Sequence, residues 1–409
     1  MNYNTYTLPG GMRLVHLPSE SPVVFCGIAV AAGTRHELPG EEGLAHFCEH
    51  LSFKGTERRT AVQIINSIEG LGGELNAFTN KEDTVYYCAL LRDHVRKAVD
   101  VLFDIVFNSQ YPQAEVEKER EVVCDEIESY EDSPSELIFD DIENILFAGH
   151  PLGHNILGTS DRVRRYNSDD ACRFTSRHYR PDRCVFFASG DVDFDKLVKW
   201  LSGLSPLAPP APDPTPLPTS PSPRLLTSDT VIRQRGTHQA HVIVAAPSIS
   251  ATDPRRWSLY LLNNILGGPS LNSRLSLSLR ERRGLVYSVE SSMVGYSDTG
   301  IWTVYFGCDP SDVGRCRRLV RHELNRLMEN PLTDSQLRAA KRQLKGQLAI
   351  SCDNREHFVL DSARNYLHTG AMRDLADIFA RIDRVTADEM QLTAQTLFAE
   401  EKTTTLIYT

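Results

Sequence analysis

The sequence predicts an α+β protein made of two duplicated domains, each a mostly antiparallel sheet packed against helices. With 409 residues the chain is too long for one ordinary core and suits two domains of roughly 200 residues each. A proline-rich stretch divides it near the middle, at 204–223. The order of strands, turns and helices before this stretch recurs after it, which indicates a duplication.

The proline-rich stretch 204–223 holds nine of the 22 prolines of the chain. Such a segment cannot form a helix or an interior strand, and it favours the extended polyproline II conformation. A proline-rich ligand for an adaptor domain is one interpretation. We prefer a semi-rigid linker, which gives domains at 1–203 and 224–409.

The first half alternates strand-like and helix-like segments. The Pro9-Gly10-Gly11 turn between two extended runs predicts a hairpin at the start. We expect strands at 6–8, 12–15, 23–31, 74–79 and 84–89, and helices at about 41–52, 60–71, 94–107, 114–130 and 135–147. The last of these helices is expected to complete the helical layer of the first domain.

The second half repeats this order. Thr84-Val85-Tyr86-Tyr87 is echoed by Thr303-Val304-Tyr305-Phe306, and each is followed by a turn, a helix reaching Asn108 or Asn330, a proline and another charged helix. The two halves therefore resemble copies of one domain.

The segment His46-Phe47-Cys48-Glu49-His50 carries the clearest chemical signal. On a helix, His46 and His50 project from one face about one turn apart, so both imidazoles can bind one zinc ion. Glu49 completes the order H-x-x-E-H, the inverted form of a zinc-protease signature in which the glutamate is the general base. A surface helix with two solvated histidines is the alternative. Cys48 points off the ligand face and is expected to fill the core.

A catalytic zinc ion usually takes three protein ligands, so one more is needed. On the predicted helix 114–130, Glu119 and Glu126 fall on the apolar stripe and should face inward. Two carboxylates on a buried face require a cation, which zinc would supply. Pairing with Arg or Lys from another element is the alternative.

Other acidic residues of this helix are weaker candidates. Asp125 is the nearest competitor for the ligand role, whereas Glu121 and Glu128 fall on the solvated side. In the second half, the helical run 258–266 stands where the first has its motif, and it contains neither histidine nor carboxylate. We therefore expect one Zn²⁺ per chain, held by the first copy.

Composition narrows the function classes. Hydrophobic residues at 41% and charged residues at 24% are typical of a soluble protein, and no apolar run approaches the roughly 18 residues of a membrane span. The net charge of -10 disfavours a nucleic-acid partner. The first residues do not resemble a signal peptide, and the nine cysteines fit reduced core thiols, so we expect a cytoplasmic protein.

At this point the chain resembles the M16 family of zinc metallopeptidases, the inverzincin group that includes mitochondrial processing peptidase and many bacterial members. The motif extends to Gly43-Leu44-Ala45 before His46 and to Leu51-Ser52-Phe53-Lys54-Gly55-Thr56 after His50. The family's distal glutamate matches Glu126, which agrees with the position of Glu126 on the apolar stripe of the predicted helix 114–130. The resemblance implies that Glu119 is an accessory glutamate near the metal, important without being a ligand.

Substrate-binding residues also follow from the resemblance. Asn76, Ala77 and Phe78 match the family's edge strand that pairs with the substrate backbone, and Arg283 and Tyr287 match a segment that binds substrate in the zinc site. Further matches are His150-Pro151-Leu152-Gly153 and Ile156-Leu157-Gly158-Thr159.

The resemblance implies a fold of the LuxS/MPP-like metallohydrolase type and zinc-dependent cleavage of short or unfolded peptides. His46, His50 and Glu126 would hold the metal, and Glu49 would act as general base. Family members of this size form half of a clamshell and dimerise, so we expect a homodimer, or a heterodimer with an inactive paralogue. Two alternatives remain: a non-catalytic scaffold or partner subunit of a peptidase heterodimer, and a structural zinc site with four protein ligands.

Overall fold

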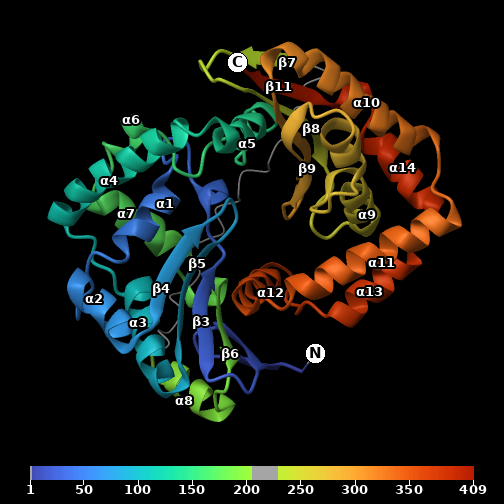
Figure 1. The fold of residues 1–409 in the computed structure, drawn as a ribbon. Coiled ribbons are helices and arrows are strands. Elements are labelled where there is room, and N and C mark those ends of the chain that lie inside the picture. The colour runs from blue at the N-terminus through green and yellow to red at the C-terminus, as the bar shows by residue number, and fades with distance from the viewer. Residues whose placement is uncertain (1, 205–228) are drawn as a thin grey trace. The chain divides into compact units, whose positions relative to one another are not determined.

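The structure of the protein is a computed structural model that describes residues 2–204 and 229–409 (Figure 1). The described residues form two compact units. The first comprises 2–129, 154–204 and 352–373, and the second comprises 130–153, 229–351 and 374–409. The predicted linker is 204–223, and all of it except residue 204 lies outside the described residues.

The first unit is built on a six-stranded sheet in the order β1-β2-β6-β3-β5-β4. Its strands are β1 (Asn4–Thr7), β2 (Arg13–Pro18), β3 (Val23–Val30), β4 (Glu74–Thr79), β5 (Thr84–Leu91) and β6 (Cys184–Gly190). Strands β2 and β6 are parallel, and the other neighbours are antiparallel. Strands β1 and β4 are the edges, so the predicted edge strand with Asn76, Ala77 and Phe78 has one side without a strand neighbour in the sheet.

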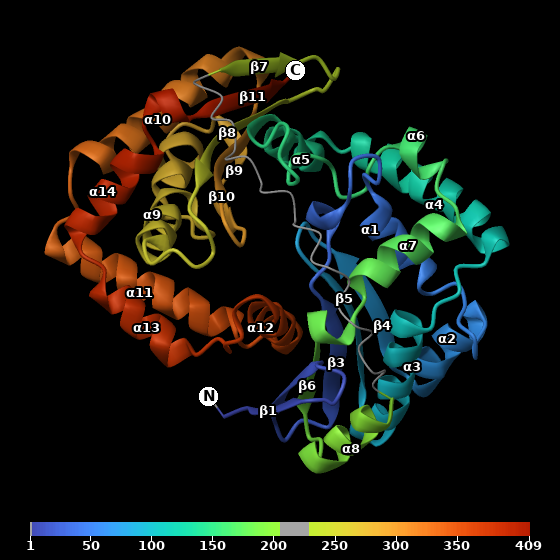
Figure 2. The ribbon, with the colours of Figure 1, turned by 180° about the vertical axis from the view of Figure 1, so that it is seen from behind.

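Helices cover one face of this sheet with a large apolar core (Figure 2). They are α1 (Leu44–Leu51), α2 (Ala61–Ile68), α3 (Val95–Phe107), α4 (Gln113–Glu131), α6 (Ser160–Val163), α7 (Ser168–His178) and α8 (Phe194–Leu204). Helix α1 lies between the sheet and α7, and Cys48 is completely buried there, as core filling requires. The site helix is therefore an interior element of its unit.

The second unit has a five-stranded sheet in the order β7-β11-β8-β10-β9. Its strands are β7 (Thr230–Arg233), β8 (Ala240–Ser248), β9 (Val286–Gly295), β10 (Gly300–Cys308) and β11 (Thr404–Tyr408), of which only β7 and β11 form a parallel pair among the described residues. Its own helices are α9 (Arg256–Gly267), α10 (Val313–Glu329), α11 (Asp334–Ser351), α13 (Leu375–Arg384) and α14 (Ala387–Leu397). Two sheet-and-helix domains, mostly antiparallel, confirm the predicted fold class.

The two sequence halves exchange one helix each. Helix α12 (Arg355–Thr369), from the second half, packs its Val359, Ala363 and Leu367 on the second face of the first sheet. Helix α5 (Pro134–Leu146), from the first half, packs on the face of the second sheet that its own helices leave free. We expected this helix to complete the helical layer of the first domain, and this expectation is wrong. Its apolar residues Ile138, Ile142 and Leu146 pack against the sheet of the second unit instead.

Helix α1 begins at Leu44, three residues after its predicted start. Gly43 has φ 90°, which ends the preceding loop and cannot continue a helix. A Cβ at this position would also lie 2.6 Å from the Leu157 carbonyl oxygen, so the close approach requires glycine.

The helices within 2–204 and 229–409 include none with the length and apolar character of a membrane span.

Replacing Asp83 by Asn is expected to destabilise the first unit by roughly 3 kcal/mol, because it leaves the partly buried guanidinium of Arg364 without its anion. Asp83 lies in the β4–β5 turn with a side chain only 2% exposed, and it binds Arg364 at 2.8 Å and His368 at 2.9 Å on α12. Denaturant unfolding measures the change. The control Asp361→Asn removes a 54% exposed carboxylate and should cost little, and equal costs for both variants would refute the argument.

Lowering the pH from 7 to 5 should destabilise the first unit through His178. Burial, with Arg183 nearby, lowers the pKa of this histidine to about 3, whereas the unfolded chain takes up its proton near pH 6.5. Stability is thus present above pH 6.5 and decreases as the pH falls toward 3, by about 2 kcal/mol between pH 7 and 5. Glutamine does not titrate, so His178→Gln should lose less stability than the parent between pH 7 and 5. Urea unfolding of both proteins at both pH values measures this, and equal losses of stability in the two proteins would contradict the assignment.

Candidate metal centre

Helix α1 places three functional side chains together. His46 and His50 lie one turn apart with ring centroids 4.6 Å from each other, and Glu49 is next to the second ring in sequence. His46 is 7% exposed and Glu49 8%, because the opposite side of α1 packs its apolar residues into the core. The alternative of a solvated surface helix is therefore excluded.

Glu126 reaches the two histidines from α4. Its Oε1 lies 3.8 Å from His46 Nε2, and its Oε2 lies 3.4 Å from His50 Nε2. One ligand atom from each of these residues lies within 4.8 Å of the others, the one such group of metal-ligating side chains among the described residues. These distances are long for hydrogen bonds but close to the spacing of about 3.4 Å between neighbouring ligands of a tetrahedral zinc ion.

Glu119, also from α4, binds the other ring nitrogen of His50. Its Oε1 lies 2.9 Å from His50 Nδ1, and its Oε2 lies 2.6 Å from Lys54 Nζ. With 4% exposure, Glu119 is buried, as its position on the apolar stripe predicts. Its contact with Lys54 means that the alternative of pairing with a basic residue is also met in part. A carboxylate on the outer nitrogen fixes which nitrogen of a histidine faces a metal.

Among the other carboxylates of α4, Glu126 departs from its predicted inward position. Glu126 keeps a 44% exposed side chain, which leaves the group open on one side. Glu121 and Glu128 are exposed, and so is Asp125, which does not join the group of ligand atoms. The stripe argument is therefore confirmed for Glu119 and wrong for the burial of Glu126, because a carboxylate on the open side of the group stays in contact with solvent.

The edge strand contacts the site through Thr79, the last residue of β4. Its hydroxyl donates to Glu49 Oε2 at 2.5 Å. Neither this bond nor the Lys54 contact was predicted from the sequence. Thr79 does stand at the end of the predicted strand next to the substrate-binding residues, and Lys54 follows His50 by four residues, so both were within the segments that carry the motif.

Burial and neighbouring charges set the proton affinities. Burial lowers the pKa of His46 to about 4, with His50 adding to the effect. Burial also opposes protonation of His50, but the hydrogen bond to Glu119 and the nearby Glu126 carboxylate raise its pKa to about 9. Burial raises the pKa of Glu49, although the Thr79 hydroxyl opposes this shift. A carboxylate with a raised pKa is a better proton acceptor than an ordinary one.

Arg283 and Tyr287 belong to the second unit, whereas the other predicted site residues belong to the first. Arg283 Nη1 donates to the Ser278 carbonyl at 2.8 Å, and Tyr287, in the edge strand β9, is 87% exposed. Their role toward a substrate stays a prediction. Helix α9, the counterpart of α1, carries no histidine or carboxylate, as the sequence indicates.

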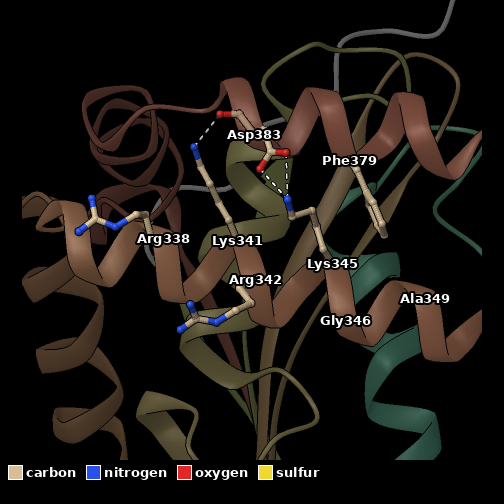
Figure 3. A pocket seen from close by; sticks show the side chains of 8 residues that line it. All are labelled: Arg338, Lys341, Arg342, Lys345, Gly346, Ala349, Phe379 and Asp383. Atoms are coloured by element: carbon tan, nitrogen blue, oxygen red, sulfur yellow. Dashed lines mark hydrogen bonds and ion pairs between the residues drawn. The ribbon is translucent and has the colours of Figure 1, made fainter.

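The second unit has a groove between α11 and α13 (Figure 3). Four basic side chains of α11 line it together with Phe379 and Asp383 of α13. Lys345 binds the Asp383 carboxylate at 2.8 Å, and Lys341 binds its backbone oxygen. With a single carboxylate already paired and no histidine in its lining, this groove lacks the ligands of the first unit's site.

Comparisons with known proteins agree with this geometry. Residues 14–160 match the model of the insulinase (peptidase M16) family, and 165–344 match that of the peptidase M16 inactive domain. An uncharacterized zinc protease of Streptomyces coelicolor is 36% identical over 98% of this chain and 88% of its own length. One from Bacillus subtilis is 33% identical over 98% and 97%. The mitochondrial-processing peptidase subunit beta of Saccharomyces cerevisiae is 30% identical over 94% and 86%.

Solved structures share the fold. A protease from Helicobacter pylori superposes with a TM-score of 0.91 at 21% identity, covering 100% of this chain and 99% of that one. A peptidase M16 inactive domain from Pseudomonas fluorescens gives 0.90 at 18% identity, covering 100% and 98%. Two family models and relatives matched along nearly the whole sequence lead to one conclusion: the chain belongs to the M16 family of peptidases.

Proposed function

We propose that the protein is a zinc-dependent endopeptidase that hydrolyses short or unfolded peptides. The observation that carries this proposal is the convergence of His46, His50 and Glu126 beside an independent carboxylate, Glu49. Two imidazoles and one carboxylate form a donor set that suits Zn²⁺, and three protein ligands leave a position open for chemistry. A purely structural site would use four ligands and no free base.

Each side chain has a defined task. His46, His50 and Glu126 would hold the ion, and Glu119 would orient His50 through its Nδ1. When bound, zinc supplies a Lewis acid that polarises the scissile carbonyl and makes the attacking water more acidic. Glu49 accepts a proton from that water and delivers it to the nitrogen of the leaving amine. Thr79 holds the Glu49 carboxylate in place through its hydroxyl.

The edge strand gives the substrate its orientation. An extended peptide can add to β4 at Asn76, Ala77 and Phe78 through main-chain hydrogen bonds, which make little demand on side chains. The strand ends at Thr79, so a peptide aligned along it passes the Glu49 carboxylate. We therefore propose broad specificity. Arg283 and Tyr287 are proposed to bind substrate, and the working form is proposed to be a homodimer or a heterodimer with an inactive paralogue.

Replacing Glu49 by Gln should keep zinc bound while hydrolysis falls by about 10²–10⁴-fold, because the amide cannot accept the proton. Metal analysis gives the zinc content, and mass spectrometry of a digested peptide library gives the activity. Glu128→Gln on the solvated side of α4 is the matched control and should behave as the parent. Substantial activity in Glu49→Gln would remove the general base from the proposal.

Replacing Glu126 by Gln should weaken zinc binding and abolish hydrolysis together, because a neutral amide is a poor zinc ligand. Removing the metal from the parent with a chelator should have the same effect, and added Zn²⁺ should restore the parent but not the variant at equal concentration. Asp125→Asn tests the competing ligand and should retain both properties. Library cleavage that persists without metal would favour another mechanism, and zinc binding without any cleavage would favour the scaffold.

A further inference from the structure

The site helix α1 lacks a capping side chain of its own. The first N–H groups of a helix have no partners within it, and Ser, Thr, Asp or Asn usually supply one. The residue in this position is Gly43, with φ 90° and no side chain. A larger residue is excluded, because a Cβ would lie 2.6 Å from the Leu157 oxygen and 2.8 Å from Gly158 Cα.

Glu37 supplies the missing cap from the preceding loop. Its Oε2 accepts the Gly43 N–H at 3.0 Å, and its Oε1 accepts the Ala45 N–H at 2.7 Å. The carboxylate side chain is only 1% exposed. A negative charge at the N-terminus of a helix also interacts favourably with the helix dipole.

His154 completes the arrangement from a different part of the chain. Its Nε2 lies 2.8 Å from Glu37 Oε2, so the buried carboxylate has three hydrogen-bond partners. The backbone oxygen of His154 in turn accepts a bond from Lys81, a 4% exposed residue in the turn after β4. The start of α1 is thus tied to the turn that follows the edge strand.

We propose that Glu37 and His154 are positioning residues that hold the first turn of α1, and with it His46, in the geometry that binds the metal. His46 directly follows Ala45, whose N–H is bound by Glu37, so a movement of this turn moves the imidazole. Metal ligands must stay within fractions of an ångström of their places. This inference rests on the proposed function, because it assigns the two residues to the zinc site.

A merely stabilising cap would not need this chemistry. Burying a carboxylate is costly, and burial does raise the pKa of Glu37, an effect that the His154 bond opposes. A neutral amide could cap one N–H but would turn its own NH₂ toward the other. The carboxylate satisfies both N–H groups at once, which fixes the direction in which α1 starts.

The test measures metal binding directly. Zn²⁺ is titrated into metal-free full-length protein in competition with a chromophoric chelator, and the visible spectrum of the Co²⁺-loaded protein reports the ligand geometry. Glu37→Gln and His154→Leu should each weaken zinc binding by about 10- to 100-fold and change the Co²⁺ spectrum. His154→Gln keeps an N–H donor and should recover most of the affinity lost in His154→Leu.

Glu41→Gln is the matched control. Its carboxylate lies in the same loop and pairs with Arg177 at 2.5 Å, but it does not cap α1. Thermal unfolding of each metal-free variant is recorded first, and if Glu37→Gln does not fold, the two His154 variants decide. Lower thermal stability with unchanged zinc affinity and Co²⁺ spectrum would overturn the inference. A parent that binds no Zn²⁺ would instead overturn the proposed function.

Discussion

The accumulation of negative charge around two imidazoles is the constraint on which the site depends. Glu49 lies on the same helix as His46 and His50, Glu119 and Glu126 reach the rings from α4, and the charge of Glu126 adds to the raised pKa of Glu49. Lys54 offsets one of the three carboxylates, and the carboxylates of Glu119 and Glu126 raise the pKa of His50. A cation held by His46, His50 and Glu126, as proposed above, would offset the negative charge that remains.

The short turn between β4 and β5 connects the parts of the first unit. Thr79 before it binds the candidate base, Lys81 binds the segment that reaches Glu37, and Asp83 binds α12. The same hairpin thus contacts the edge strand, helix α1 with the candidate metal ligands, and helix α12 on the far face of the sheet. The strand proposed to pair with substrate and the helix with the candidate metal ligands are therefore parts of one hydrogen-bonded framework.

The sequence was sufficient for whatever depends on local spacing. The separation of His46 from His50 and the seven-residue interval from Glu119 to Glu126 follow from the helical period, which is why the site could be predicted. Thr79, Glu37 and His154 could not, because their roles arise from contacts between segments far apart in the chain. The position of α5 was misjudged for the same reason: an apolar stripe shows that a helix packs on a sheet, not which sheet.

The exchange of α5 and α12 has a consequence for the synthesis of the chain. The far face of the first sheet, with Val15, Ala29 and Val185, is covered by helix α12. The residues of this helix are synthesised only after the first 352 residues of the chain. Until then this half exposes a broad apolar surface, although its metal ligands have long been made. The first unit, with its candidate metal centre, therefore cannot reach its complete fold before most of the second half of the chain has been translated.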